Sequence, residues 1–510
     1  MKKFFLSLLC LGFVVTSCNN DDDTVIEEEV VETPEEEVPV VDIEVQNFFW
    51  QTLNLYYFWQ GDVPDLADDR FDTQTAYEEY LTENAEPIDL LENKLLFSED
   101  RFTFYSDDYT ELVNSSAGVS KSNGLQFGLG RISGTDEVFG FVEYIVKNSN
   151  ASGQDIKRGD LFIGVDGQTL FSNRENPEDN NLDLLFGDND TYSLNMAEIV
   201  DGGISPSDRK VTLTKSEGLV EDPIHVSNVI TSGDKKIGYL MYNQFVSGSE
   251  DALNAIFADF IAQGVNDLVL DLRYNPGGRG STAAVLASLI RGTNTSDLLY
   301  KTVYNAKLQA EFGSSTENYF VNTTGAFDGN SDAPLNTLNL STVYIIATEG
   351  SASASELVMV GLAPYMNVVH IGGTTVGKNQ GSVLFVDDPE GGNVYDAERV
   401  DNINPNVQWG LQPIISQVEN SAGFTDYVDG LVPDIELSED VTNLGVLGNA
   451  DEPLFARAIQ EITGISGKRN FDVLMPANVV SSSKLYNPRN TVLLLNNSIP
   501  VNEIPVAEKK

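Results

Sequence analysis

The amino-acid sequence predicts a multidomain α/β protein with a helical region, a β domain and an α/β core. Aromatic residues recur at helical spacing in residues 46–115, and apolar residues alternate with period two in residues 119–217. In residues 225–465 strands alternate with helices, which implies right-handed βαβ units and a sheet covered by helices. With 510 residues, 41% of them hydrophobic, the chain is long enough for two or three domains with real cores.

The first residues resemble a bacterial lipoprotein signal peptide at residues 1–17. Lys2 and Lys3 precede an apolar stretch that is too short to span a membrane, and Cys18 follows small residues. We expect Cys18 to be lipidated and to anchor the chain in the outer membrane of the cell envelope. The alternative is an ordinary secretory signal in which Cys18 is incidental. The sequence leaves open whether the periplasmic face or the cell surface holds the protein.

Residues 18–45 are rich in Asp, Glu, Val and Pro, and we expect them to form an extended, disordered tether.

Composition excludes several classes of function. The formal net charge of −48 argues against binding to nucleic acid and against electrostatic docking on anionic lipid. With Cys10 and Cys18 as the only cysteines and His225 and His370 as the only histidines, we expect no metal site and no thiol nucleophile.

Residues 46–115 form the predicted helical region. Seven aromatic or apolar side chains between Phe48 and Trp59 recur at helical spacing, and further helical patterns cover residues 73–81 and 87–96. Aromatic residues at this spacing usually form a core, so we assign them no ligand.

Residues 119–217 carry the β character. Leu125, Phe127 and Leu129 alternate at period two, and Ile132 falls out of phase, where we expect the strand to end or bulge. The segment Lys157–Gly167 resembles the part of a PDZ domain in which a short helix meets a tight Gly-Asp turn. A small β domain that only spaces its neighbours is the alternative.

The PDZ resemblance implies a peptide-binding site. Gly124, Leu125, Gln126 and Phe127 stand where PDZ domains place the loop whose free backbone amides bind a peptide's terminal carboxylate. The bound peptide then adds a strand to the sheet. We expect these four residues to line the site.

Two short segments of the core carry the chemistry. Gly350–Glu356, with the sequence GSASASE, joins an apolar strand to a helical pattern, which we expect to leave a serine hydroxyl exposed at a sheet edge, beside the free amides of a helix N-terminus. Gly373–Lys378 places a lysine just after another apolar run. A serine and a lysine on neighbouring turns could form a Ser–Lys nucleophile–base pair.

Three blocks resemble the S41 family of C-terminal processing, or tail-specific, serine peptidases: Asp271–Gly278, Ser351–Glu356 and Gly372–Lys378. The resemblance covers nearly all of residues 46–465, and it implies a crotonase- or ClpP-like catalytic core. It also implies that Ser353 is the nucleophile and Lys378 the base. For the oxyanion, the amide of Ala354 is one candidate donor, and the resemblance implies an amide of Gly277 or Gly278 as the other.

The proposed base places a demand on the fold. Lysine accepts a proton only as a neutral amine, so its pKa must fall far below the value of about 10.4 in model peptides. Lys378 must therefore be enclosed by apolar and amide groups, with no carboxylate in contact. Each motif also has a simpler reading: Ser353 and Glu356 fit a helix capping box, and Lys378 alone fits a solvated loop.

The third member of the catalytic group is left open. The family often has a glutamine four residues after the lysine, and here that position is Ser382. Gln380 or Ser382 could orient the amine, or the site could be weakened. We give His225 and His370 no catalytic role.

The sequence therefore predicts a lipid-anchored serine endopeptidase that cuts proteins or peptides near their C-termini after PDZ capture, without a cofactor. The alternatives are a peptide-binding lipoprotein whose peptidase site has decayed, and a PDZ domain that acts only as a lid. We expect residues 466–510 to form a tail that adds a strand or lies on the surface.

Overall fold

The computed structural model describes residues 42–177, 179–327, 332–465, 471–476, 479–486 and 493–494. The expected signal peptide, Cys18 and nearly all of the acidic tether lie outside the described residues, as does most of the expected tail. In the part of the chain that is described, none of the helices combines the length and apolar character needed to cross a bilayer. The same residues contain no group of three His, Cys, Asp or Glu side chains that could hold a metal ion.

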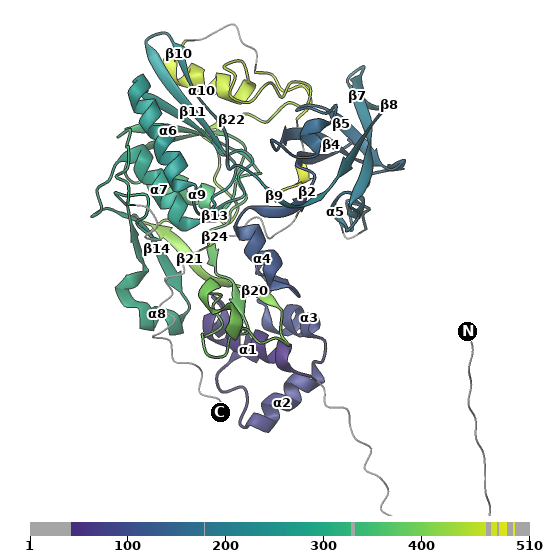
Figure 1. The fold of residues 1–510 in the computed structure, drawn as a ribbon, viewed down its shortest axis with the longest axis vertical. Helices are drawn as coiled ribbons and strands as arrows, with labels where there is room; N and C mark the ends of the chain where they lie inside the picture. The colour runs from purple at the N-terminus through teal and green to yellow at the C-terminus, as the bar shows by residue number, and fades with distance from the viewer. Residues whose placement is uncertain are drawn as a thin grey trace, which may run out of the picture. The chain divides into compact units, whose positions relative to one another are not determined.

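The N-terminal helical region is confirmed, and it packs directly on the α/β core (Figure 1). Phe49 at the buried face of its first helix meets Trp409 of the core edge to face, with ring centroids 5.4 Å apart. The side chain of Thr73 caps the second helix by accepting a hydrogen bond from the Ala76 amide. The helices of the region are α1 (Glu44–Tyr56), α2 (Gln74–Glu83), α3 (Pro87–Leu90) and α4 (Tyr109–Ser116).

The β domain has a hydrophobic core of its own. Its sheet has the strand order β23-β3-β4-β5-β7-β8, so β3 pairs with β4 on one side and with β23 from the C-terminal segment on the other. The strand that starts at Leu125 ends at Arg131, before the out-of-phase Ile132. The elements are β2 (Val119–Ser122), β3 (Leu125–Arg131), β4 (Val138–Ile145), β5 (Leu161–Val165), β6 (Gln168–Thr169), α5 (Asp183–Phe186), β7 (Thr191–Val200), β8 (Gly203–Thr214), β9 (Ser216–Val220) and β23 (Val479–Ser482).

The core sheet has the order β10-β11-β12-β16-β17-β22, and all its pairs except β10 with β11 are parallel. Alternate residues of its strands face two different hydrophobic cores, one shared with α6, α7 and α9 and the other with α10. The predicted α/β class is therefore confirmed. These elements are β10 (Ile224–Ser232), β11 (Lys235–Tyr242), α6 (Glu250–Gln263), β12 (Asp267–Asp271), α7 (Gly280–Arg291), β16 (Thr342–Ala347), α9 (Ala354–Leu362), β17 (Asn367–Gly372), β22 (Ile435–Glu436) and α10 (Pro453–Thr463).

A second sheet of the core joins segments that are far apart in the sequence, in the order β13-β24-β18-β21-β14-β15. It places the residues after Gly277 and the residues after Lys378 in one sheet. Its strands are β13 (Gly278–Arg279), β14 (Leu298–Tyr304), β15 (Glu317–Tyr319), β18 (Gln380–Ser382), β21 (Ile414–Asn420) and β24 (Leu493–Leu494). The remaining elements are β1 (Phe104–Ser106), β19 (Phe385–Val386) and β20 (Gly410–Gln412), which form a small sheet, and the helix α8 (Ala306–Phe312).

Candidate active site

The serine segment forms a tight turn between β16 and α9. Ser353 has a backbone φ of +61°, a conformation that a residue with a side chain rarely adopts and that marks stored strain. Its side chain is buried, with 1% of its surface exposed. The strained turn places Ser353 at the start of α9, as the sequence pattern predicted, but the hydroxyl is buried and not exposed at the sheet edge as expected.

The three serines of the segment differ in their hydrogen bonds. Ser351 Oγ donates to the Leu272 carbonyl at 2.8 Å, and Ser355 Oγ donates to the Asn275 carbonyl at 2.9 Å. Ser353 Oγ is buried and has no hydrogen-bond partner among the described residues. Two of the serines therefore hold the turn in place, and only the third keeps its hydroxyl available for chemistry.

Glu356 joins the serine turn to the lysine turn. Its Oε2 accepts hydrogen bonds from the Ser353 amide at 2.7 Å and from the Lys378 amide at 2.9 Å. Its Oε1 accepts from the Gly377 amide at 2.7 Å and from Thr375 Oγ1 at 2.5 Å. Burial raises the pKa of this carboxyl, while the four hydrogen bonds act in the opposite direction. Because one oxygen binds both amides, the backbones of Ser353 and Lys378 lie within a few ångströms of each other.

The Lys378 amine is fully buried and has no hydrogen-bond partner in the described chain. It lies 4.6 Å from the centroid of the Phe102 ring and forms no ion pair with the carboxylates of the described residues. Desolvation lowers the pKa of Lys378 from 10.5 to about 7, against the opposing influence of Asp100 and Glu356. These are the surroundings that a neutral amine requires. The amine and Ser353 Oγ are not hydrogen-bonded to each other in this structure.

Gln380 and Ser382 occupy β18, two residues apart on a buried strand. Gln380 Oε1 and Ser382 Oγ have no hydrogen-bond partner among the described residues, so neither is bonded to the lysine amine. Other unpartnered buried polar atoms are Asn379 Oδ1 and Ser416 Oγ, which precede and face this segment, and Tyr427 Oη, which interacts electrostatically with Glu356. Native proteins leave few such atoms unsatisfied, so their concentration here is typical of a site that receives a polar ligand.

The candidate oxyanion donors differ in availability. The Ala354 amide stands in the first turn of α9, where an N–H has no acceptor within the helix, and no other acceptor reaches it in the described chain. The Gly277 amide already donates to Asn275 Oδ1 at 2.9 Å, which corrects the expectation that it is free. Gly278 begins β13 and pairs with Leu493. Gly277 nevertheless lies against the nucleophile turn, because a Cβ built on it would be 2.7 Å from Ser353 Cβ.

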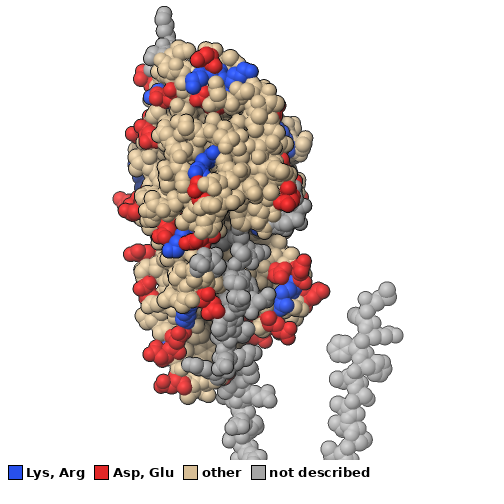
Figure 2. Space-filling view, turned by 90° about the vertical axis from the view of Figure 1, so that its left-hand side faces the viewer, with Lys and Arg blue, Asp and Glu red and all other residues tan. Residues whose placement is uncertain are grey.

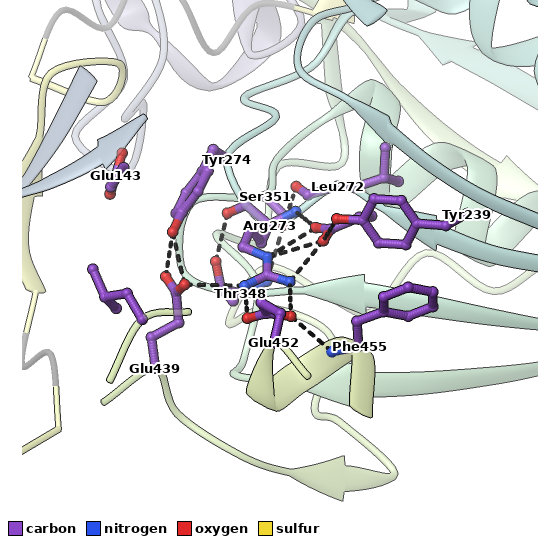
Figure 3. A network of polar contacts seen from close by, with 12 residues as sticks. Glu143, Tyr239, Leu272, Arg273, Tyr274, Thr348, Ser351, Glu439, Glu452 and Phe455 are labelled. Carbon is purple, nitrogen blue, oxygen red and sulfur yellow. Dashed lines mark hydrogen bonds and ion pairs between the residues drawn. The ribbon is translucent and has the colours of Figure 1, made fainter. Parts of the chain in front are cut away.

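A buried network of charged side chains around Arg273 lies next to the serine turn (Figure 3). The fully buried Arg273 donates to Asp271 at 2.7 Å, to Glu452 at 2.7 and 2.9 Å, and to Glu439 at 3.0 Å. The Arg273 carbonyl accepts a hydrogen bond from Thr348 Oγ1 at 2.6 Å, at the start of the serine segment. The Asp-Leu-Arg block thus fixes the turn through its backbone as well as its charges.

The expected carboxylate-binding loop of the β domain is not free. The Gly124 amide donates to Ser122 Oγ, and the Leu125 amide donates to Asn123 Oδ1, both at 3.0 Å. The Phe127 amide donates to Ser483 Oγ at 3.0 Å, and Ser483 Oγ donates to Gln126 Oε1 at 2.6 Å. This corrects the expectation of free amides: local side chains satisfy two of them, and the C-terminal segment satisfies a third.

Sequence reasoning missed the joining role of Glu356, which it had assigned only to a capping box. The signal was present in part, since a glutamate three residues after an N-cap serine binds the cap amide. Its contacts with Gly377 and Lys378 join residues more than twenty positions apart, and local spacing does not contain them. His370 is buried, with Nε2 against the Ala347 carbonyl, and burial lowers its pKa.

Comparison with known proteins agrees with this architecture. Residues 236–413 match the family model of peptidase family S41, and residues 44–104 match the Peptidase S41 N-terminal domain. The chain is 29% identical over 175 residues to a probable CtpA-like serine protease of Staphylococcus epidermidis, which is 33% of this chain and 32% of that protein. The corresponding Staphylococcus aureus protein is 29% identical over 188 residues, 36% of this chain and 34% of the relative. The chain thus spans about a third of the length of the curated relatives it matches.

A solved structure covers much more of the chain. The putative S41 protease from Bacteroides fragilis is 25% identical and superposes with a TM-score of 0.57, over 82% of this chain and 97% of that one. Its coverage includes regions outside the two matched segments. The chain thus carries segments similar to the N-terminal and peptidase domains of family S41, in this order and on a fold similar to that of an S41 protease.

Proposed function

We propose that the chain is a serine endopeptidase in which Ser353 is the nucleophile and Lys378 the general base. One observation carries the proposal: an unpartnered serine hydroxyl and an unpartnered, desolvated amine belong to two residues whose backbone amides both donate to the same carboxylate oxygen of Glu356. Burial lowers the pKa of the Lys378 amine to about 7, so near neutral pH a large share of it is neutral and can act as a base.

The reaction follows from these positions. Lys378 Nζ takes the proton of Ser353 Oγ while the oxygen attacks the scissile carbonyl carbon, and a tetrahedral oxyanion forms. The Ala354 amide and the Gly278 amide donate hydrogen bonds to that oxyanion. When the C–N bond breaks, the Lys378 ammonium returns the proton to the leaving amine. A water molecule, deprotonated by the same amine, then hydrolyses the serine ester. Substrate binding must bring Oγ and Nζ into hydrogen-bonding contact, as often happens only in the loaded enzyme.

The substrate class we propose is the C-terminal region of proteins or peptides. The β domain supports this, because β3 pairs with an additional antiparallel strand at its outer side, the geometry by which PDZ domains take extended peptides. Gln380 and Ser382 are the candidates to orient the lysine amine, through the unpartnered oxygens on β18.

Substituting either member of the pair tests the proposal. In the purified chain, Ser353→Ala and Lys378→Ala should each lower kcat on an unfolded protein substrate by about 10³-fold or more. Lys210→Ala, which changes an exposed lysine of β8, is the control and should leave kcat unchanged. Mass spectrometry of the products should place the cuts near substrate C-termini. Full activity of the Ser353→Ala protein would eliminate the proposed nucleophile.

We further propose that Cys18 is lipidated and holds the protein in the cell envelope at the outer membrane. The motif at the N-terminus supports this, with Cys18 as the first residue of the mature chain. Cells fed a radiolabelled fatty acid should label the wild-type protein and not the Cys18→Ala variant. Equal labelling of both proteins would exclude this anchor.

A further inference from the structure

The chain's own C-terminal segment runs along β3, on the side of the β domain where the sequence predicted peptide binding. Figure 1 draws the β domain and the C-terminal part of the chain in one view. Strand β23 pairs antiparallel with β3, with Val479 opposite Gly130 and Ser482 opposite Gly128. The ladder continues where the Ser483 amide donates to the Phe127 carbonyl at 2.8 Å. This is the backbone pairing that an extended peptide ligand makes when it adds a strand to a sheet edge.

Side chains of the same segment reach three parts of the protein. Ser483 Oγ bridges the Phe127 amide and Gln126 Oε1 in the expected carboxylate-binding loop. The Tyr486 ring stacks on Phe186 at the end of α5, with centroids 3.8 Å apart and planes 10° apart. Lys484, only 7% exposed, donates to the Asn243 carbonyl at 2.9 Å. Strand, loop and helix of the β domain therefore all contact the segment.

Further along, the chain enters the sheet of the candidate active site. Strand β24 lies between β13 and β18 and pairs in parallel with both. Leu493 is opposite Gly278, and Leu494 is opposite Ser382. Gly278 follows the glycine that touches Ser353, and Ser382 stands on the strand that follows Lys378. A substrate strand that approached the dyad between these two segments would have to occupy the position that β24 fills.

We propose that residues 479–486 and 493–494 are an intramolecular peptide ligand that occupies the substrate path and holds the peptidase in an autoinhibited state. The inference rests on the proposed function, because it takes the outer side of β3 and the sheet positions beside β13 and β18 as the substrate path. The segment is held by short strands of four and two residues. Val480 is 43% exposed, whereas Ser482, Lys484 and Leu494 are buried, so release must break short strand pairings and a few enclosed side-chain contacts.

Simple competition sets the size of the effect. A tethered segment has an effective local concentration on the order of 1 mM. If the same segment as a free peptide had a Kd of about 0.1 mM, it would be bound about ten times more often than released. Release of the segment should therefore raise the apparent affinity for substrate about tenfold. A substrate that binds both the outer side of β3 and the position between β13 and β18 could displace the segment.

The first test measures binding and needs no catalysis. The probe is a fluorescein-labelled synthetic peptide with the sequence of residues 479–494, titrated with the full-length chain carrying Ser353→Ala. Adding Tyr486→Ala or Leu494→Asp should tighten its binding about tenfold, because each weakens one end of the tethered segment. Leu474→Asp is the matched control, since Leu474 belongs to the same C-terminal region and is 79% exposed. It should leave the affinity unchanged.

The second test measures hydrolysis of a fluorogenic peptide by the same variants with Ser353 intact. Tyr486→Ala and Leu494→Asp should raise kcat/KM about tenfold, and adding the unlabelled 479–494 peptide should reverse the gain. If both variants bind the probe no better than Leu474→Asp, the inference is wrong. A lower unfolding temperature with unchanged probe binding would likewise make the segment a structural strand and overturn it. Tighter binding without hydrolysis in any variant would support the intramolecular ligand and count against the peptidase.

Discussion

Lys378 and Lys484 are both buried lysines, and the surroundings of their amines differ. Lys484 Nζ donates to the Asn243 carbonyl and lies 3.4 Å from Glu221. Lys378 Nζ has neither a hydrogen-bond partner nor an ion pair among the described residues. A buried ammonium without partners is costly, so the neutral amine is the form that these surroundings stabilise. The neutral amine has a free lone pair, which can take a proton from the serine hydroxyl during the reaction.

The pH dependence of activity should report this amine. Lys378 must be neutral to deprotonate Ser353, and its pKa is about 7. We therefore expect kcat/KM to rise tenfold per pH unit below about pH 7 and to level off above it. Steady-state rates between about pH 5 and pH 9 would show this limb. A flat profile across that range would mean that another group limits the reaction.

The buried Lys378 amine should also lower the free energy of unfolding, and this loss should be larger at low pH than at high pH. Between about pH 7 and pH 10.5 the unfolded chain binds a proton at Lys378 that the folded chain does not, so stability rises with pH there. Below about pH 7 both states bind the proton, and the folded state carries the full cost, on the order of 5 kcal/mol. Lys378→Met should therefore raise the free energy of unfolding near pH 6 by about 3 kcal/mol.

Urea unfolding near pH 6 and pH 9 measures this effect, with the exposed Lys210→Met as the matched control. The control should change stability by less than about 0.5 kcal/mol at both values. The advantage of Lys378→Met should shrink at the higher pH. A destabilised Lys378→Met protein would show that the amine is better accommodated than its surroundings indicate.

At the scale of elements, the strand–turn–helix around Ser353 depends on the loop that packs against it. Gly277 has φ +111°, and a Cβ there would be 2.7 Å from Ser353 Cβ and 2.9 Å from the Ala352 carbonyl oxygen. Both contacts are too short for any ordinary packing. The turn and the loop can therefore adopt their places together only if this position lacks a side chain.

Gly277→Ala should displace the nucleophile turn and lower kcat by about 10²-fold, with the overall fold retained. Gly134→Ala is the matched control: its φ of +80° imposes similar backbone strain, and a Cβ there meets no atom within 4 Å. Circular dichroism would verify folding, and kcat on one substrate would rank the two variants. Equal kcat values would show that backbone strain alone, and not contact with Ser353, decides the effect.

The elements differ in how far the sequence predicts them. The core alternation was predictable because each strand and helix shows its own periodicity. Gly264 ends α6 with φ +75°, a conformation that glycine adopts readily. The short strands β13, β18, β23 and β24 carry two to four residues each, too few for a periodic pattern. Their pairing joins Gly278 with Leu493 and Gly128 with Ser482, partners that only the tertiary fold selects. The joining role of Glu356 was not predictable for the same reason, because its contacts are with residues far along the chain. The candidate nucleophile and base were predictable because each lies in a short sequence motif.

At the scale of the whole molecule, the formal charge of −48 leaves few cations to balance acidic side chains. On the face drawn in Figure 2, acidic side chains gather along the edges, and basic ones form small, separate groups. The buried arginines are correspondingly important. Arg158 of the β domain donates to the Glu143 carbonyl at 2.6 Å, to Tyr274 Oη at 2.7 Å and to Glu439 at 2.7 Å. Through Glu439 it reaches Arg273, so one chain of contacts connects the β domain to the nucleophile turn.

Arg158→Gln should therefore weaken the attachment of the β domain to the core and also lower activity. In this variant Glu439 would keep its ion pair with Arg273 and lose the one with Arg158. The site is buried, where removing one member of an ion pair costs about 3–5 kcal/mol. Differential scanning calorimetry should show a lower first transition, and kcat should fall in the same variant. Arg174→Gln is the control in the same domain, because its ion pair with Asp136 is 3.9 Å long and half exposed, and it should change stability by less than about 1 kcal/mol. If Arg158→Gln lowers stability and leaves kcat unchanged, the network holds the domains together without acting on the site.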